Sequence, residues 1–436
     1  MPESVVTAAP SIGLTATRKA MWRLIPLIAL GYGTAYIDRV NISFAALQMN
    51  LDLHFSGITY GLGAGLFFLS YAACEVPSNL LLCRFGARRW LSRIMFTWGI
   101  IAISMMFVRT PRQFYILRFL LGMAEAGFFP GVVYYLTQWF PPNMRARAIS
   151  RFYVSLPLSS AVMGALAGAL LNLQGRLGLA GWQWLFLVEG LPAITLSIAF
   201  FLLLPDDPTK AHWLTGPERS WLIDQIEQDA CSGGHRHNIG RALLDPRVFQ
   251  ISVVNLLMLC FSYAYIFSLP DILLRLTSFS VTNVGYLVST MGLIGAAAMI
   301  LNAQRSDRTG ERHWHTAFPF LVITAAFLIG GLSTRPFLAV PAIAAVAIGY
   351  PALLGPFLAI PPTFLKGKSM AAGIAAINTL GMLGGFIGPY WMGYAKDLTG
   401  DYQRGLLTLT IPALLCALLI LWMRRVALRG TPAAIN

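Results

Sequence analysis

Long apolar runs recur along the whole chain, and short segments rich in charged residues, Gly and Pro separate them. About 20 apolar residues allow an α-helix to cross roughly 30 Å of bilayer hydrocarbon. The pattern therefore predicts an all-α membrane protein with twelve transmembrane helices. The first begins at Leu24 and continues past Asp38 and Arg39, and the others lie at about 58–82, 91–109, 112–138, 147–172, 182–204, 247–271, 281–303, 315–334, 336–362, 369–394 and 405–423.

The amino-terminal 20 residues form a polar segment rich in small residues, and we expect this segment to be mobile. Basic residues before the first apolar run resemble the start of a signal peptide. No small-residue cleavage site follows, so we predict that this helix is retained.

A polar stretch, residues 205–246, divides the chain into two sets of six helices. We predict an amino-terminal bundle over 1–204, a linker over 205–246 and a carboxy-terminal bundle over 247–436. His235 and His237 in the linker lack further ligands, so we expect no metal site there. The sequence CRFGAR (83–88) follows the second helix, and DRTGER (307–312) follows the eighth. Two bundles related in this way are typical of transporters that bind substrate between their halves.

Composition supports membrane insertion, because 56% of the 436 residues are apolar and 11% are charged, with a mean hydropathy of +0.64. Soluble domains carry about 25% charged residues. The net charge of +14 does not predict nucleic-acid binding, since 23 of the 32 Lys and Arg residues fall in segments on the side of the termini. The positive-inside rule then makes both termini cytoplasmic. The five cysteines have no CxxC spacing and are expected to be unpaired core residues.

Charged residues inside the apolar runs indicate where function lies, because each costs roughly 2.5–3.5 kcal/mol to insert. Arg118 and Glu125 are seven residues apart in one run, so a continuous helix would place them on the same face. The structural alternative is a pair that only fixes packing. The other such residues are Asp38, Arg39 and Glu75, with Glu189 nearer a helix entrance; the carboxy-terminal runs offer only polar candidates, Tyr263, Tyr265 and Asn378.

Arginine forks suit carboxylates, and they remain protonated. Buried carboxyl groups that change protonation suit proton coupling. Two structural interpretations remain open: Asp38 and Arg39 form a self-neutralised pair, and Glu75 only packs.

The chain resembles the major facilitator superfamily in the loops after helices two and eight. It is more narrowly similar to the anion:cation symporters, which include permeases for tartrate, phthalate, sugar acids and hydroxyphenylacetate. The segments that carry the resemblance are YIDRVNIS (36–43), EVPSNLLLCRFGARRW (75–90), RFLLGMAEAGFFPG (118–131), SDRTGERHWH (306–315) and INTLGMLGGFIGP (377–389). The superfamily loop motif acts as a gate, and its residues here are Arg84, Gly86, Arg88, Asp307, Arg308, Gly310 and Arg312. Cys83 stands where the motif usually has Asp, which weakens the expected latch.

The resemblance implies roles for the polar residues. Arg39 and Arg118 would hold the anion, Asp38 and Glu125 would carry protons, and Tyr71 and Asn378 would line the site. Tyr263 is a further substrate-contact candidate from the pattern of polar residues. None of the six histidines lies deep in a predicted helix, so we expect no enzyme and no cofactor.

The sequence therefore predicts a monomeric, proton-coupled symporter in the plasma membrane, the inner membrane in bacteria. It would import a small carboxylate, such as a dicarboxylate, a sugar acid or an aromatic acid, by alternating access. An anion exchanger or uniporter of the same fold remains an alternative. An efflux antiporter is the other, although an exporter of cationic drugs would want acidic residues without paired arginines.

Overall fold

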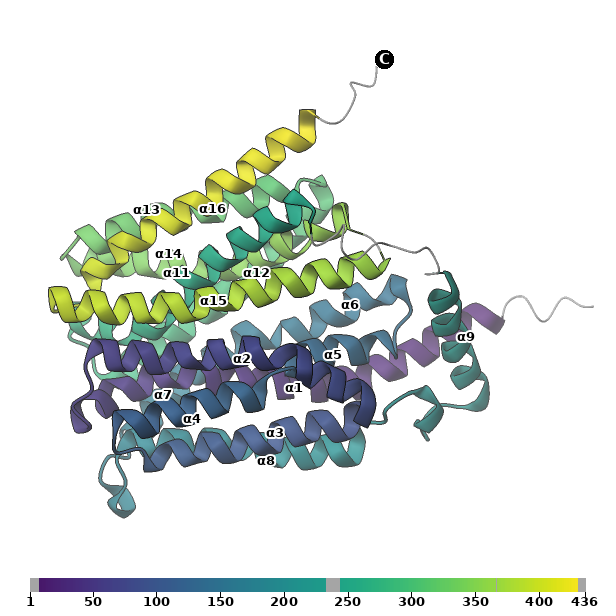
Figure 1. Ribbon diagram of the computed structural model, residues 1–436, viewed down its shortest axis with the longest axis horizontal. Coiled ribbons are helices and arrows are strands. Elements are labelled where there is room, and N and C mark those ends of the chain that lie inside the picture. Colours follow the sequence, from purple (N-terminus) through teal and green to yellow (C-terminus); the bar gives the residue numbers. More distant parts are fainter. Residues whose placement is uncertain (1–7, 233–243, 366, 430–436) are drawn as a thin grey trace, which may run out of the picture.

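The computed structural model of the chain describes residues 8–232, 244–365 and 367–429, and every regular element in this part is a helix (Figure 1). The amino-terminal bundle contains α1 (Ala8–Asp52), α2 (Gly57–Phe85), α3 (Ala87–Ser104), α4 (Pro111–Glu125), α5 (Phe128–Thr137), α6 (Pro142–Tyr153), α7 (Ser155–Leu171) and α8 (Gly181–Leu203). The carboxy-terminal bundle contains α11 (Pro246–Thr277), α12 (Val281–Thr309), α13 (Arg312–Leu332), α14 (Pro336–Leu358), α15 (Gly367–Thr399) and α16 (Gln403–Arg429). Helix α9 (Gly216–Ser232) lies between them in the sequence.

The predicted twelve spans agree with this architecture. Ten helical segments of the described residues are long and apolar enough to cross a membrane, and α4 with α5 and α6 with α7 each contribute to one of them. Helices α1 and α15, with 45 and 33 residues, complete the twelve.

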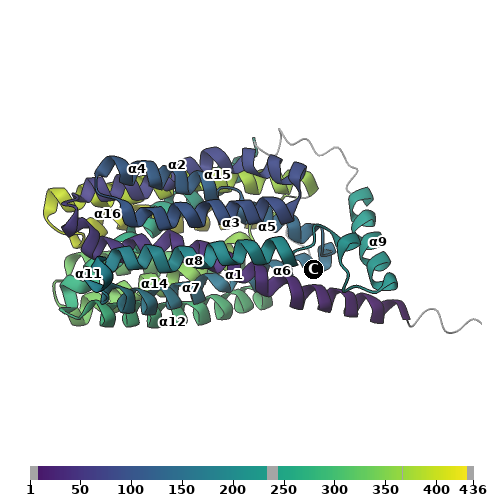
Figure 2. The same ribbon diagram turned by 90° about the horizontal axis from the view of Figure 1, so that it is seen from below.

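Helix α1 begins and α16 ends toward the same end of the bundle, the right in Figure 1, where α9 also lies. Figure 2 shows α9 and the start of α1 at this end again. We call it the termini side, and we call the other end the opposite side. Because successive spans run in alternating directions, α2 begins at the opposite side and α15 ends there.

Two helix pairs make the largest contacts between the bundles, since α2 packs on α15 and α7 packs on α12, and α1 also contacts α11. Glycine makes both contacts possible. A Cβ atom on Gly61 would lie 2.3 Å from the Pro389 carbonyl oxygen, and one on Gly164 would lie 2.5 Å from the Gly285 oxygen. Larger residues would hold these backbones apart. Both contacts lie toward the opposite side, so the bundles are closed against each other there.

A carboxylate adds a polar bond to this closed side. Asp397 at the end of α15 accepts the backbone N–H groups of Gly57 at 2.7 Å and Ile58 at 2.8 Å, at the start of α2. The first N–H groups of a helix have no partner within the helix, and the helix dipole favours an anion there. The carboxy-terminal bundle therefore caps a helix of the amino-terminal bundle.

The structure corrects three expectations. The first helix already begins at Ala8, within the segment expected to be mobile, and Lys19 forms an ion pair with Glu218 of α9 at 2.8 Å. The linker is partly helical, because α9 buries Leu222. The expected span 112–138 is interrupted after Glu125.

His235 and His237 lie outside the described residues. The cysteines are expected in the core, but of the four described ones only Cys416 is buried, and Cys83 is exposed; all four are free. No group of three potential metal ligands occurs in the described part.

Replacing Asp397 by Ala should loosen the opposite side, because two N–H groups of α2 lose their acceptor. Loss of a helix cap costs about 0.5–2 kcal/mol, so the population of the separated state should rise roughly 2- to 30-fold. Spin labels on cysteines at Leu177 and Leu332, both exposed at the opposite side, would report the distance in a background without other cysteines.

Asp401→Ala is the matched control. Asp401 accepts the N–H of Arg404 at 3.0 Å and caps a helix inside one bundle. Identical distance distributions in the two variants would show that the Asp397 cap does not hold the bundles together.

Candidate functional site

A buried ion pair joins α1 to the end of α4. Arg39 of α1 donates through Nη2 to Oε1 of Glu125, the last residue of α4, and both side chains are almost completely buried. The second oxygen of Glu125 and Nε of Arg39 have no hydrogen-bond partner. The pair thus keeps unused hydrogen-bonding capacity on both groups, although a buried charge requires compensation.

The helix that carries Glu125 is broken directly after this residue. Helix α4 ends at Glu125, and Gly127 adopts φ +86°, a left-handed conformation suited to glycine. Pro130, in the first turn of α5, has no N–H, so it cannot donate a helical backbone hydrogen bond across the break. Arg118 and Glu125 both lie on α4, as the sequence predicts, but the ion-pair partner of Glu125 is Arg39 of α1.

Arg118 is a fully buried guanidinium, with 0% of its surface exposed. Its two hydrogen bonds are long, 3.4 Å each, to the carbonyl oxygens of Gly63 and Ala64 in α2. Across the described residues, no carboxylate lies within ion-pair distance of it. Arg118 therefore has no direct ion-pair partner in the described residues, and the carboxyl groups of Asp38 and Glu125 act on its charge from farther away.

Aromatic rings of α2 lie against both arginines. The Phe67 ring is 5.2 Å from the Arg39 guanidinium and 5.0 Å from that of Arg118, and the Tyr71 ring is 5.3 Å from Arg39. Such contacts stabilise a cation by about 0.5–2 kcal/mol. We did not predict Phe67 from the sequence. Its spacing of four residues from Tyr71, which places both on one helix face, is the signal that could have identified it.

Asp38 is buried but is not paired with its neighbour Arg39. Its Oδ1 accepts a hydrogen bond from Asn41 Nδ2 at 3.3 Å, and its Oδ2 has no partner. No ion pair joins Asp38 and Arg39 in the part of the chain that the structure describes. The arrangement does not match the alternative of a self-neutralised pair.

The carboxy-terminal bundle reaches this region with two side chains. Arg39 Nη1 donates to the Tyr263 hydroxyl of α11 at 3.4 Å, and Asn378 Nδ2 of α15 donates to Glu75 Oε1 at 2.8 Å. Asn378 therefore has a structural partner that we did not expect, and Glu75 bonds across the two bundles. We call Asp38, Arg39, Phe67, Tyr71, Arg118, Glu125 and Tyr263 the charged cluster.

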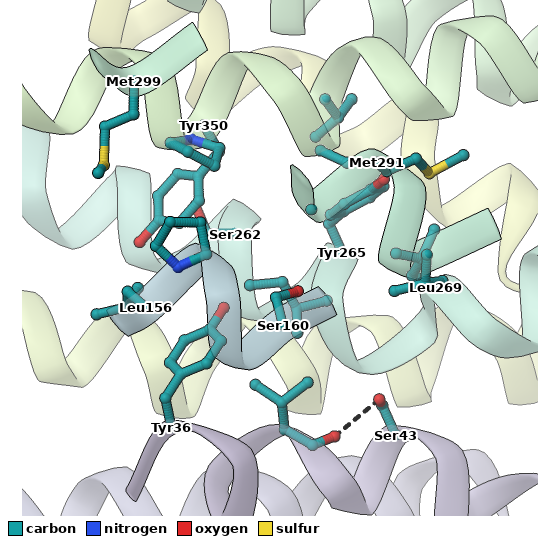
Figure 3. A pocket seen from close by; sticks show the side chains of 18 of the residues that line it. Tyr36, Ser43, Leu156, Ser160, Ser262, Tyr265, Leu269, Met291, Met299 and Tyr350 are labelled. Atoms are coloured by element: carbon teal, nitrogen blue, oxygen red, sulfur yellow. Dashed lines mark hydrogen bonds between the residues drawn. The ribbon is translucent and has the colours of Figure 1, made fainter. Parts of the chain in front are cut away.

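A cavity of about 70 Å³ lies beside this cluster, between α1 and α7 of one bundle and α11, α12 and α14 of the other. Figure 3 shows Tyr36 and Ser43 on α1 at the bottom, with Met299 and Tyr350 on the far side of the cavity. The hydroxyl-bearing residues of its wall are Tyr36, Ser43, Tyr153, Ser160, Ser262, Tyr265 and Tyr350, among apolar neighbours. None of the seven residues predicted to bind substrate or protons lines it in the described structure.

The first gate motif lies at the termini side, where α2 turns into α3. Gly86 adopts φ +84°, and a Cβ there would lie 2.7 Å from Asp206 Oδ1. Asp206, at the start of the linker, accepts the Arg88 N–H at 3.0 Å, and Arg88 Nε donates to the Phe201 carbonyl oxygen. Arg84 lies against the Phe85 ring. The motif usually has Asp at the position of Cys83, which is exposed here. Asp206 thus supplies a carboxylate to this turn from the linker.

The second gate motif is also bonded within its own bundle. Gly310 adopts φ +68°, Arg312 donates to the Ala359 carbonyl oxygen at 3.3 Å, and Glu311 forms an ion pair with Arg424 at 3.3 Å. Partial burial alone would raise the pKa of Glu311, but the Trp314 N–H and Arg424 hold it below its ordinary value. Asp307 and Arg308 are exposed. No contact of either motif in the described residues joins the two bundles.

Comparison with known proteins adds relatives to this geometry. The sequence model described as "Major Facilitator Superfamily" matches residues 28–389. A "Putative tartrate transporter" of Agrobacterium vitis is 42% identical over 420 residues, which cover 96% of this chain and 92% of that protein. A "Quinolone resistance transporter" of Acinetobacter baumannii is 40% identical over 396 residues, 90% of this chain and 91% of that protein.

A solved structure shares the fold. The crystal structure of a bacterial homolog to the human lysosomal transporter Spinster, in an inward-facing and occupied conformation, has a TM-score of 0.76 at 17% identity, with 94% of this chain and 98% of that chain covered. The chain belongs to the Major Facilitator Superfamily, and it is a multi-pass membrane transporter, not an enzyme.

Proposed function

We propose that the protein is a proton-coupled symporter that imports a small organic anion with at least one carboxylate. Residues 1–204 and 247–436 form the two bundles that alternate in access, and residues 205–246 link them. The termini side faces the cytoplasm of a bacterial inner membrane, and the protein works as a monomer. The tartrate relative supports the class of substrate.

One observation carries this proposal: Arg118 is fully buried without a carboxylate partner. Burying an ion without a partner costs several kcal/mol, so the site gains stability when an anion arrives. A guanidinium fork accepts a carboxylate through two parallel hydrogen bonds. Phe67 lies against both Arg118 and Arg39, so one small anion can reach the two guanidinium groups from this region.

The Arg39–Glu125 pair supplies a mechanism for coupling. An incoming carboxylate competes with Glu125 for Arg39. Once displaced, Glu125 has no counter-ion and takes up a proton, because the neutral acid is far less costly to bury than the ion. Anion and proton then favour each other's binding, and reciprocity requires the effect to be equal in both directions. Asp38 is the second proton site of this proposal.

Residues of the carboxy-terminal bundle complete the site. Tyr263 of α11 accepts a hydrogen bond from Arg39, so displacement of the Arg39 side chain by substrate would break or move this contact with α11. Tyr71 lines the site from α2. Asn378 leaves its hydrogen bond with Glu75 and bonds the substrate instead. At the termini side, Arg84, Gly86, Arg88, Asp307, Arg308, Gly310 and Arg312 form the gate. With the bundles closed at the opposite side, substrate leaves toward the termini side.

Export of a drug-sized compound is the second candidate, and the quinolone-resistance relative favours it. The cavity beside the charged cluster is largely apolar with several hydroxyls, which suits an aromatic ligand. The two buried arginines favour an anion as the ligand in either direction.

Uptake into proteoliposomes under an imposed pH gradient separates the candidates. Labelled tartrate should accumulate inside when the outside is acidic, and other mono- and dicarboxylates should compete. A symporter loses this accumulation when a protonophore is added. Quinolone movement against its gradient, without any carboxylate accumulation, would contradict the proposal and favour export.

Arg118→Gln should weaken anion binding by about 100-fold or more, because the anion loses a buried partner. Arg118→Lys should recover only part of the affinity, since an ammonium offers a point charge and no fork. Tartrate binding to the purified protein by calorimetry would measure both.

Exposed Arg109→Gln is the control and should bind as the wild type does. Wild-type affinity in Arg118→Lys would overturn the bidentate model.

Glu125→Gln should still exchange internal for external anion but should fail to accumulate it under a pH gradient. The amide imitates the protonated acid and has no proton to release. Counterflow and gradient-driven uptake in the same proteoliposomes distinguish the two activities.

The double variant with Asp38→Asn is the control for a shared role: if Asp38 carries part of the coupling, any accumulation left in Glu125→Gln disappears in the double variant. Accumulation by Glu125→Gln at the wild-type level would mean that Glu125 is not the coupling site.

A further inference from the structure

A second carboxyl group is buried behind the charged cluster, on α8. Glu189 is 3% exposed, and neither of its oxygens has a hydrogen-bond partner. Asn41 of α1, 1% exposed, has an unpartnered Oδ1. Unsatisfied buried polar groups are rare, so each calls for an explanation.

These groups form a chain that leads to Asp38. Asn41 lies three residues after Asp38 on the same face of α1 and donates to it at 3.3 Å. Helix α8 packs on α1 and brings Glu189 near enough to Asn41 and Asp38 for both to act on its carboxyl group. Asn41 is therefore the polar side chain shared by the two carboxyl groups.

The charges around the two carboxyl groups differ. Arg118 and Glu125 of α4 and Arg39 of α1 all act on Asp38. Glu189 meets no cation: within the described residues, no ion pair joins it to α1, α3 or α7, the helices packed against α8. An ionised Glu189 would lie beside another carboxylate with nothing to compensate it, whereas a protonated Glu189 has an O–H to donate.

We propose that Glu189 keeps a proton throughout the transport cycle and is a positioning residue for Asp38. Its O–H donates to Asn41 Oδ1, which fixes the orientation of the amide. The Asn41 N–H then donates to ionised Asp38 and stabilises the carboxylate. Asp38 thereby releases its proton more readily after each turn. This inference rests on the proposed role of Asp38 in proton coupling.

Two substitutions at Glu189 separate positioning from proton carriage. Glu189→Gln retains a donor for Asn41 Oδ1, so accumulation under a pH gradient and its pH profile should match the wild type. Glu189→Met removes the donor and leaves the amide free to turn. Ionised Asp38 is then less stabilised, and the pH profile of tartrate uptake should move toward alkaline pH by about one unit.

Asn41→Ala should move the pH profile in the same direction, and the double variant with Glu189→Met should move it no further. In an Asp38→Asn background, Glu189→Met should have no effect on the pH profile. Loss of accumulation in Glu189→Gln would overturn the proposal, because it would show that the proton on Glu189 turns over. An unchanged pH profile in well-folded Glu189→Met would also overturn it.

A spectroscopic readout does not depend on transport. The infrared C=O stretch of a protonated carboxyl group should be present in the purified wild type at alkaline pH and missing in Glu189→Gln. If the wild type shows no gradient-driven accumulation, the proposed function fails while this band still tests Glu189. If the band is the same in both proteins, Glu189 is ionised and the inference fails alone.

Discussion

The interaction on which the site depends is the buried ion pair between Arg39 and Glu125. Around it lie one further arginine, Arg118, and one further carboxyl group, Asp38. With all four ionised, the formal charges cancel, as a low-dielectric environment requires. A carboxylate that enters together with a proton leaves this sum unchanged. A dianion would require two protons, and in the proposed function Asp38 and Glu125 accept them.

The fold places the charged groups so that the partner of Arg39 can change. The break after Glu125 places its carboxylate at the end of a helix, beside α1. Arg39 also donates to Tyr263 of the other bundle, so the proposed change of partner at Arg39 would alter a contact between the bundles. Glycine contacts and the Asp397 cap close the opposite side, whereas the gate motifs at the termini side are bonded within their own bundles. In the proposed function, a substrate at the charged cluster lies between this closed side and the termini side, toward which the bond between Asn378 and Glu75 also joins the bundles.

Much of this could be predicted from the sequence, because insertion into a bilayer imposes length and apolarity on every span. The same physics makes charges such as Arg118 conspicuous. The partner of Glu125 could not be predicted, since Arg39 is 86 residues away on another helix and no local pattern joins the two. Asp206 and Asp397 act on helix ends far away in the sequence, and no local pattern reveals such contacts. Phe67 is one aromatic residue among many in an apolar helix, so its place between two guanidinium groups required the structure.

Proton uptake on anion binding tests the central claim most directly. Purified protein in a weakly buffered solution with a pH-indicator dye would be titrated with tartrate or another carboxylate that binds. The account predicts that the wild type takes up close to one proton for each monoanion bound. In the Glu125→Gln variant, the anion should bind with clearly less uptake. Binding to the wild type without any proton uptake would contradict the exchange of Glu125 for substrate at Arg39.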